Sequence, residues 1–388
     1  MREKMLSRFK NIPRKEWIFV GVFVVLVILL VIWPTGYEKQ MYVHSEGVLA
    51  TVTDVDNSGR YFNGLVKQGG QSVTVRIESG KMKGQTATGQ NLYIGKMEFD
   101  KDFAAGDLAW VLLEFDEAGK ISGATMVDHY RIHLEIALVA VFALLMILIS
   151  GFTGVRTLLS FAFALLAIWK ILIPCMLNGI NPIVVALVVG NLITVATLLL
   201  VAGFTPKAFA AIAGAVACSL LTCVLAIVLG DVFKIHGAVM QWSESLLYAG
   251  YEKLNLTLIF QAGIYLACSG AILDLAVDIS SALDEVARNH PKITRKELIR
   301  SGLTIGRSVV GSQTTTLLLA YMGSYISIMM VFMAQGTPMM NILNSKMIAS
   351  EILHTFVGCI GLVIVAPLTS VICGFFLRKE SLHGNHSF

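Results

Sequence analysis

Charged residues are scarce in this chain of 388 residues, at 14% of the sequence against 55% for hydrophobic residues. Soluble domains usually carry about 25% charged residues. This shortage excludes an ordinary soluble domain and predicts an integral membrane protein. The net charge of +4 is small. Basic residues cluster at positions 2–15 and 288–300, which is typical of cytoplasmic loops and not of a nucleic-acid-binding surface.

Cysteine is absent from the polar part of the sequence, which excludes a disulfide framework or a Cys-rich zinc site there. The sequence also lacks a Ser/His or Lys dyad, an H-E-x-x-H motif and a Gly-rich phosphate loop. We therefore expect no enzymatic activity, no metal and no other cofactor. The six cysteines lie in apolar stretches and are interpreted as small buried residues: Cys175, Cys218, Cys223, Cys268, Cys359 and Cys373.

The composition divides the chain into three parts. Residues 1–41 combine a basic head with an apolar run from Trp17 to Trp33, and no small-residue cleavage pattern follows it. We expect an uncleaved signal anchor with a cytoplasmic N-terminus. Residues 42–131 form a polar domain outside the cytoplasm, and residues 132–388 are predicted to form a seven-helix transmembrane domain.

The polar domain shows the alternation of half-buried strands. In "SVTVRIES", Val73, Val75 and Ile77 alternate with polar residues, which is the period of a strand. Further candidates are "GVLATVTDV", "NLYIGKMEF", "LAWVLLEF" and "ISGATMV". Several short strands in so small a domain predict an all-β barrel or sandwich, with the OB fold as one candidate.

Seven apolar stretches after residue 131 have the length of membrane spans: 134–150, 157–177, 182–203, 208–229, 256–277, 308–333 and 352–376. With the anchor they predict a bundle of about eight transmembrane helices. Alternating the sides of the spans places Arg156, Lys207, the cluster 288–300 and the pair Arg378–Lys379 in the cytoplasm, as the positive-inside rule requires. We predict a bacterial plasma-membrane protein with both termini in the cytoplasm.

The long cytoplasmic connection between the sixth and seventh spans contains a helix start signal. In "TRKE", Thr294 and Glu297 have the spacing of a capping box. Pro291 is expected to end the preceding helix.

Two charged residues lie near the inner ends of neighbouring spans. Asp274 falls late in the sixth span, and Arg307 begins the seventh. An ionised residue at mid-span costs about 2.5–3.5 kcal/mol. Taken singly, each fits the cytoplasmic edge, where it can reach water. Taken together, they lie at one depth on antiparallel spans, which favours an intramembrane ion pair or a proton relay.

A polar cluster follows Arg307 inside the same apolar span: Ser312, Gln313, Thr314 and Thr315. Two interpretations remain open. The hydroxyl groups can bond back to the preceding helical turn. Alternatively, the cluster lines a wet cavity or bonds across to the sixth span.

Three further polar residues are secondary candidates. Lys170 lies near the outer end of the third span, where a lysine can extend its ammonium group to the interface. Glu351 and His354 open the eighth span, where an acid in the first turn also favours the helix dipole. Each can therefore be structural or part of a functional site.

Two stretches of the sequence are distinctive: "LDLAVDISSALDEV" and, after it, "SGLTIGRSVVGSQTTTLLLAYMGS". They are the most specific part of a resemblance to the YibE/F family of bacterial membrane proteins, which covers nearly the whole chain. It implies the architecture of an anchor, an outer β domain and a series of spans. It implies no particular activity.

A local similarity to SecD/SecF-type translocase subunits, relatives of the RND exporters, is more mechanistic. In those families a span carries an Asp, and the next span opens with Arg-x-x-x-x-Ser-x-Thr-Thr. Arg307, Ser312, Thr314 and Thr315 fit this spacing, although Gly311 precedes Ser312 and the number of spans differs. The similarity implies that Asp274 accepts protons and that Arg307 is its counter-charge.

Two functions therefore remain. The first is a permease or export-related transporter, driven by protons, whose substrate no sequence feature names. The second is a membrane scaffold whose domain 42–131 binds a peptide, a cell-wall component or a protein. Glycines spread through the spans also permit a homo-oligomer.

Overall fold

In the computed structural model, which describes residues 14–37 and 45–381, strands and helices separate along the chain. One unit comprises Glu38–Leu145, and the other comprises Met1–Tyr37 together with Met146–Phe388. All described strands belong to the first unit and lie within the range 42–131. Most of the predicted basic head lies outside the described residues. The two units are described separately below.

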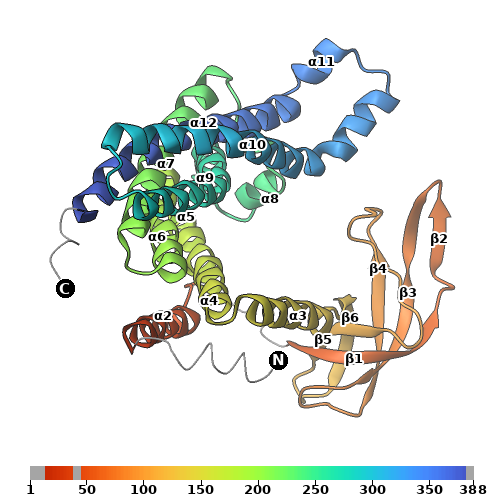
Figure 1. Ribbon diagram of the computed structural model, residues 1–388. Coiled ribbons are helices and arrows are strands. Elements are labelled where there is room, and N and C mark those ends of the chain that lie inside the picture. The colour runs from red at the N-terminus through yellow and green to blue at the C-terminus, as the bar shows by residue number, and fades with distance from the viewer. Residues whose placement is uncertain (1–13, 38–44, 382–388) are drawn as a thin grey trace. The chain divides into compact units, whose positions relative to one another are not determined.

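Six strands form one sheet: β1 (Ser45–Asp56), β2 (Arg60–Asn63), β3 (Val66–Ile77), β4 (Thr86–Tyr93), β5 (Leu108–Phe115) and β6 (Ile121–His129). Five of them close a barrel in the order β1-β5-β6-β4-β3, because β3 also pairs with β1 (Figure 1). The short β2 is added beside β3. The neighbours β4 and β6 pair in parallel, and the other pairings are antiparallel.

The barrel core follows directly from the alternation in the sequence. Val73, Val75 and Ile77 of β3 are completely buried. They pack with inward-facing residues of β1 and β5, including Val48 and Val111. Because successive side chains of a strand point to opposite faces, the intervening polar residues remain outside. The prediction of a small all-β domain is confirmed as a five-stranded barrel.

The predicted strand "NLYIGKMEF" is wrong in its second half. β4 ends at Tyr93, and the chain turns away at Gly95, where φ is +79°. The Asp100 carboxylate accepts hydrogen bonds from the backbone N–H groups of Ile94 and Gly95 at 2.8 and 3.1 Å. These donors are therefore not available to a neighbouring strand.

A buried amide pair fixes the long connection between β4 and β5 to the barrel. The Asn91 side chain donates to Gln71 Oε1 at 2.8 Å and to the carbonyl of Lys101 at 2.7 Å. Gln71 Oε1 also accepts from the backbone N–H of Phe103 at 3.0 Å. Each side-chain amide thus ties a backbone segment that has no strand partner.

Helices account for the other unit and for α3, which leads into it. Their bounds are α2 (Arg14–Ile32), α3 (Ile132–Ser150), α4 (Phe152–Ala167), the π-helical turn η1 (Ile168–Leu172), α5 (Ile173–Leu177), α6 (Pro182–Ala202), α7 (Pro206–Val232), the short 3₁₀ turn η2 (Gly237–Val239), α8 (Ser243–Tyr248), α9 (Leu256–Asn289), α10 (Arg295–Ala334), α11 (Met339–Leu343) and α12 (Lys346–Ser381).

The core of the helical unit is built around α9, which packs against α6, α7, α10 and α12 (Figure 1). Ile272, Leu275 and Ile279 form its fully buried side. Close approach depends on small residues, as is common between membrane helices. A Cβ atom at Gly358 of α12 would lie 2.7 Å from Cys268 Sγ of α9.

The predicted helix start is confirmed. The Thr294 side chain accepts from the backbone of Glu297, and the Glu297 carboxylate accepts from the backbone of Thr294 in return. The preceding helix α9 ends at Asn289, two residues before Pro291. Both features follow from local chemistry, which the sequence shows directly.

Among the described residues, six helices are long and apolar enough to cross a membrane, and a seventh is added if the bent α10 is one span. They correspond to the seven apolar stretches after residue 131. The apolar part of α2, Trp17–Ile32, is shorter than these helices. The structure thus supports a membrane-spanning helical bundle with a β-barrel domain, and the eighth span, expected in the anchor, stays a prediction.

Candidate functional site

The hydroxyl groups of α10 bond to their own helix. Ser312 Oγ donates to the carbonyl of Val309 at 2.9 Å, and Thr314 and Thr315 donate to the carbonyl of Gly311 at 3.0 and 3.1 Å. Ser312 and Thr315 are exposed in this chain, and Thr314 and Gln313 are half-buried. The geometry is that of hydroxyl groups satisfied by the preceding turn.

Asp274 and Arg307 are both exposed, and they form no ion pair with each other among the described residues. The helix faces explain their separation. Gly306 of α10 faces inward, because a Cβ atom added there would lie 2.8 Å from Ala366 and 3.7 Å from Ile279. Arg307 follows it by one residue, which turns its side chain about 100° around the helix.

Lys170 has a specific partner. Its ammonium group donates to the backbone carbonyl of Trp33 at 2.9 Å, just beyond the end of α2. Carbonyls at a helix C-terminus lack partners within the helix, and a cation satisfies them well. This contact accounts for the lysine as a structural link between α2 and η1.

Glu351 and His354 meet side chains from other helices. Glu351 Oε1 lies 4.0 Å from His354 Nδ1 one turn further along α12. Tyr325 of α10 lines the same pocket as Glu351. The Tyr321 ring lies against the His354 ring, with their centroids 4.3 Å apart. Four polar side chains from two helices therefore converge at one place.

A bend in α10 brings Tyr325 into position. The helix axis turns by 62° between Gly323 and Tyr325. Sharp bends of this kind commonly occur at Gly/Ser pairs, and the sequence has Gly323–Ser324 at this point. Beyond the bend, Tyr325 and Ile328 contribute to the wall of a pocket next to α12.

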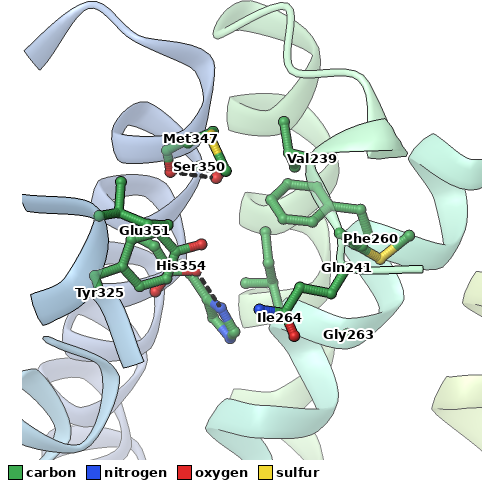
Figure 2. A pocket seen from close by; sticks show the side chains of 12 residues that line it. Val239, Gln241, Phe260, Gly263, Ile264, Tyr325, Met347, Ser350, Glu351 and His354 are labelled. Atoms are coloured by element: carbon green, nitrogen blue, oxygen red, sulfur yellow. Dashed lines mark hydrogen bonds and ion pairs between the residues drawn. The ribbon is translucent and has the colours of Figure 1, made fainter. Parts of the chain in front are cut away.

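The pocket has a volume of about 390 Å³. Figure 2 shows Tyr325, Glu351 and His354 on one side and Phe260 and Gln241 on the other. The remaining lining residues come from the η2 segment, α9, α10 and α12: Val239, Met240, Gly263, Ile264, Ile328, Met347 and Ser350. The volume is within the range of ligand pockets, about 300–1,000 Å³.

Some polar atoms of the pocket have hydrogen-bond partners within the protein, and others do not. Ser350 Oγ donates to the carbonyl of Met347 at 2.7 Å. His354 Nε2 is buried and has no hydrogen-bond partner among the residues that the structure describes. The described residues also contain no group of three or more His, Cys, Asp or Glu side chains arranged for a metal. The arrangement suits a ligand that is recognised by a carboxylate, an imidazole and a phenol.

Sequence reasoning found part of this constellation. It marked Glu351 and His354, whose i, i+3 spacing places them on one helix face. It missed Tyr321 and Tyr325, although their i, i+4 spacing carries the same signal, and it missed Phe260 and Gln241. Nothing in the chain order connects these residues from different helices.

The fold and the pocket define a class: a polytopic membrane protein with a β-barrel domain and a mainly apolar pocket between its helices that contains a carboxyl group and an imidazole. A comparison with protein families matches residues 138–379 to the YibE/F-like protein family. The match covers more than half of the chain, and the chain belongs to this family. Comparisons with curated proteins and with solved structures return no match.

Proposed function

We propose that this YibE/F-like protein is a permease of the bacterial plasma membrane, with its solute site in the pocket between α9, α10 and α12. The observation that carries the proposal is the convergence of Tyr325, Glu351 and His354 on a pocket inside an apolar bundle. Ionisable groups in membrane helices are costly, and they commonly mark solute or ion pathways. Transport needs no enzymatic step and no cofactor.

The bend in α10 supports movement of the pocket wall. Broken helices in membrane proteins occur where backbone lines a cavity, and transporters use them at their binding sites. Tyr325 lies beyond the bend, whereas Glu351 lies on the long helix α12. A change in the bend would move the phenol away from the carboxylate and open the pocket.

Accessibility of the pocket from both sides of the membrane tests the permease directly. Gly263 lines the pocket, and a Cβ atom added there has nothing within 4 Å. Gly263→Cys, in a chain whose six native cysteines are replaced by alanine, is labelled with a membrane-impermeant thiol reagent in vesicles of both orientations. We expect labelling from both sides. Labelling from one side alone contradicts alternating access.

Ala249→Cys is the matched control, because Ala249 is exposed just after α8. It is expected to react from one side, which also shows that each vesicle preparation is oriented as intended.

The same experiment bears on topology. We propose that the barrel lies outside the cytoplasm and that both termini lie inside, as the positive-inside rule indicates.

We also propose that Asp274 supports proton coupling. Asp274 is an ionisable residue at an exposed position of α9, a helix long and apolar enough to cross a membrane. Proton flux into liposomes under an imposed pH gradient and membrane potential, read with a trapped dye, is expected to need Asp274. An Asp274→Asn variant with the flux of the wild type would remove this part of the proposal and leave the pocket untouched.

A second candidate function is a scaffold whose barrel binds a peptide or protein. The observation that favours it is the exposed apolar tip of the β2–β3 hairpin, where Leu65 is 90% exposed and Phe62 is 62% exposed. The strand order of the barrel also matches an OB-type barrel, a fold that commonly binds ligands on its surface. Loss of partner crosslinking in a Phe62→Ser/Leu65→Ser variant would support it, and unchanged crosslinking would count against it.

A further inference from the structure

The pocket contains one carboxyl group, and no lysine or arginine of its lining pairs with it. Glu351 is the sole Asp or Glu among the lining residues, and the lining contains no Lys or Arg. Among the described residues, the basic group within 4.0 Å of its carboxylate is His354, with Nδ1 at 4.0 Å. The Glu351 side chain is 16% exposed. A carboxylate so far removed from water needs a compensating partner.

The other lining residues of the pocket include aromatic rings and polarizable methionine side chains. The Phe260 ring lies across the pocket from Glu351, and the Tyr325 ring is close to the carboxylate (Figure 2). Met240 and Met347 add polarizable thioether groups to the lining. Aromatic faces attract cations through the ring quadrupole, and quaternary ammonium groups are recognised in this way.

Other ligand classes fit the pocket less well. An anion would meet the Glu351 carboxylate with no lysine or arginine to hold it. A structural or catalytic metal usually takes three or four protein ligands, whereas the pocket offers one carboxylate and one imidazole. A neutral solute would leave the carboxylate without a counter-charge.

We infer that the pocket binds a small organic cation of the ammonium class, with Glu351 as the counter-charge and Phe260 and Tyr325 as its aromatic walls. This inference rests on the proposed function and names the class of solute for the same site. The volume of about 390 Å³ is sufficient for a compact ammonium compound. The Gln241 amide offers a further acceptor at the rim.

The test compares three probes of similar size and different charge on the purified full-length protein. Choline is the cation, 3,3-dimethylbutan-1-ol is its neutral carbon isostere, and butyrate is an anion. Isothermal titration measures binding, and the rise in Tm with ligand checks it. We expect choline to bind at millimolar or lower concentration and to bind at least about tenfold more tightly than the neutral isostere.

Glu351→Gln removes the charge and keeps the shape of the side chain. It is expected to weaken choline binding about tenfold or more. Glu285→Gln, the same change at an exposed acid near the far end of α9, is expected to leave binding unchanged. Tyr325→Phe and Phe260→Leu keep the test decisive if Glu351→Gln fails to fold. Phe260→Leu is expected to weaken choline and to spare the neutral isostere.

Three results would overturn the inference. They are equal binding of choline and its neutral isostere, wild-type choline binding by Glu351→Gln, and absence of choline binding to a folded protein. Tight Zn²⁺ binding lost in both Glu351→Gln and His354→Gln would assign the pocket to a metal instead. None of these results affects the labelling of Gly263→Cys from two sides, so the permease and the class of its solute fail separately.

Discussion

Two carboxyl groups of this molecule each lie near a tyrosine, but they differ in their charged neighbours. Asp102 of the barrel unit accepts a hydrogen bond from Tyr93, and Glu351 of the helical unit shares a pocket with Tyr325. Asp102 also has Lys67 and Arg60 as ion-pair partners. Among the described residues, no lysine or arginine lies within 4.0 Å of the Glu351 carboxylate.

The difference separates structure from function. A carboxylate between two cations at a partly exposed position holds a loop in place and needs no ligand. A carboxylate in an apolar pocket without a lysine or arginine partner would be stabilised by a bound cation. The comparison therefore predicts that Asp102 stabilises the barrel and that Glu351 takes part in binding.

The largest effect is expected at Gly237, which precedes the pocket-lining residue Val239 by two positions. A Cβ atom at Gly237 would lie 1.9 Å from the backbone oxygen of Leu256, whereas one at Gly263 meets nothing within 4 Å. Gly237→Ala should destabilise the protein by about 1–3 kcal/mol through overpacking. Gly263→Ala should be neutral or stabilise it by up to about 1 kcal/mol, since alanine favours the helix. Thermal unfolding of the two purified variants measures both, and equal Tm values would refute the distinction.

The next prediction concerns Glu351 itself, where a substitution should change cation affinity but not lower stability. Glu351→Gln should lower cation affinity about tenfold while leaving Tm unchanged or slightly raised, because it removes a charge that the fold does not compensate. Asp102→Asn should do the reverse, with lower stability of the barrel and unchanged binding. Paired Tm and titration measurements on the two variants test this. A Glu351→Gln protein that loses stability and binding in parallel would show that the carboxylate is structural.

A smaller effect is the pH dependence of the barrel. Burial by itself would raise the pKa of Asp102, but hydrogen bonds from Lys67 and Tyr93, together with the charges of Lys67 and Arg60, outweigh it and lower the pKa. The stabilisation is therefore present above the unfolded value of about 3.9 and is lost as pH falls through the lower folded value.

Tyr93, which donates a hydrogen bond to Asp102, affects stability at alkaline pH. Burial, then the hydrogen bond and the charge of Asp102, raise the pKa of Tyr93 to about 12, although Arg60 opposes the shift. Its contribution is present below the unfolded value of about 10 and is lost as pH rises toward the folded value. Trp110 fluorescence, in a chain whose other tryptophans are phenylalanine, follows both transitions. Asp102→Asn should weaken the acid transition and Tyr93→Phe the alkaline one; a profile unchanged in either variant would contradict the assignment.

The smallest effect is expected on the hydroxyl row of α10. Thr315 is exposed and bonds to the carbonyl of Gly311 at 3.1 Å, so its hydroxyl group needs no other residue. Thr315→Val should change the free energy of unfolding by less than about 0.5 kcal/mol. A loss of more than about 1 kcal/mol would show that the hydroxyl has a partner outside this chain.

The sequence by itself determined the local elements of this protein. Long apolar runs must form helices in a membrane, because no water satisfies their backbone groups. Val73, Val75 and Ile77 alternate as a strand must, and Thr294 with Glu297 caps α10 as their spacing requires. Each of these signals is carried by neighbours in the chain.

Only the tertiary structure decided which polar residues act together. The sequence predicts Asp274 and Arg307 at one depth, yet Gly306 lies beside Ile279, and both charged residues are exposed without pairing with each other. Glu351 and Tyr325 meet because α10 bends after Gly323 and α12 passes beside it. Hydrophobic runs fix where a helix begins and ends, but packing of side chains such as Cys268 against Gly358 fixes its rotation and its neighbours.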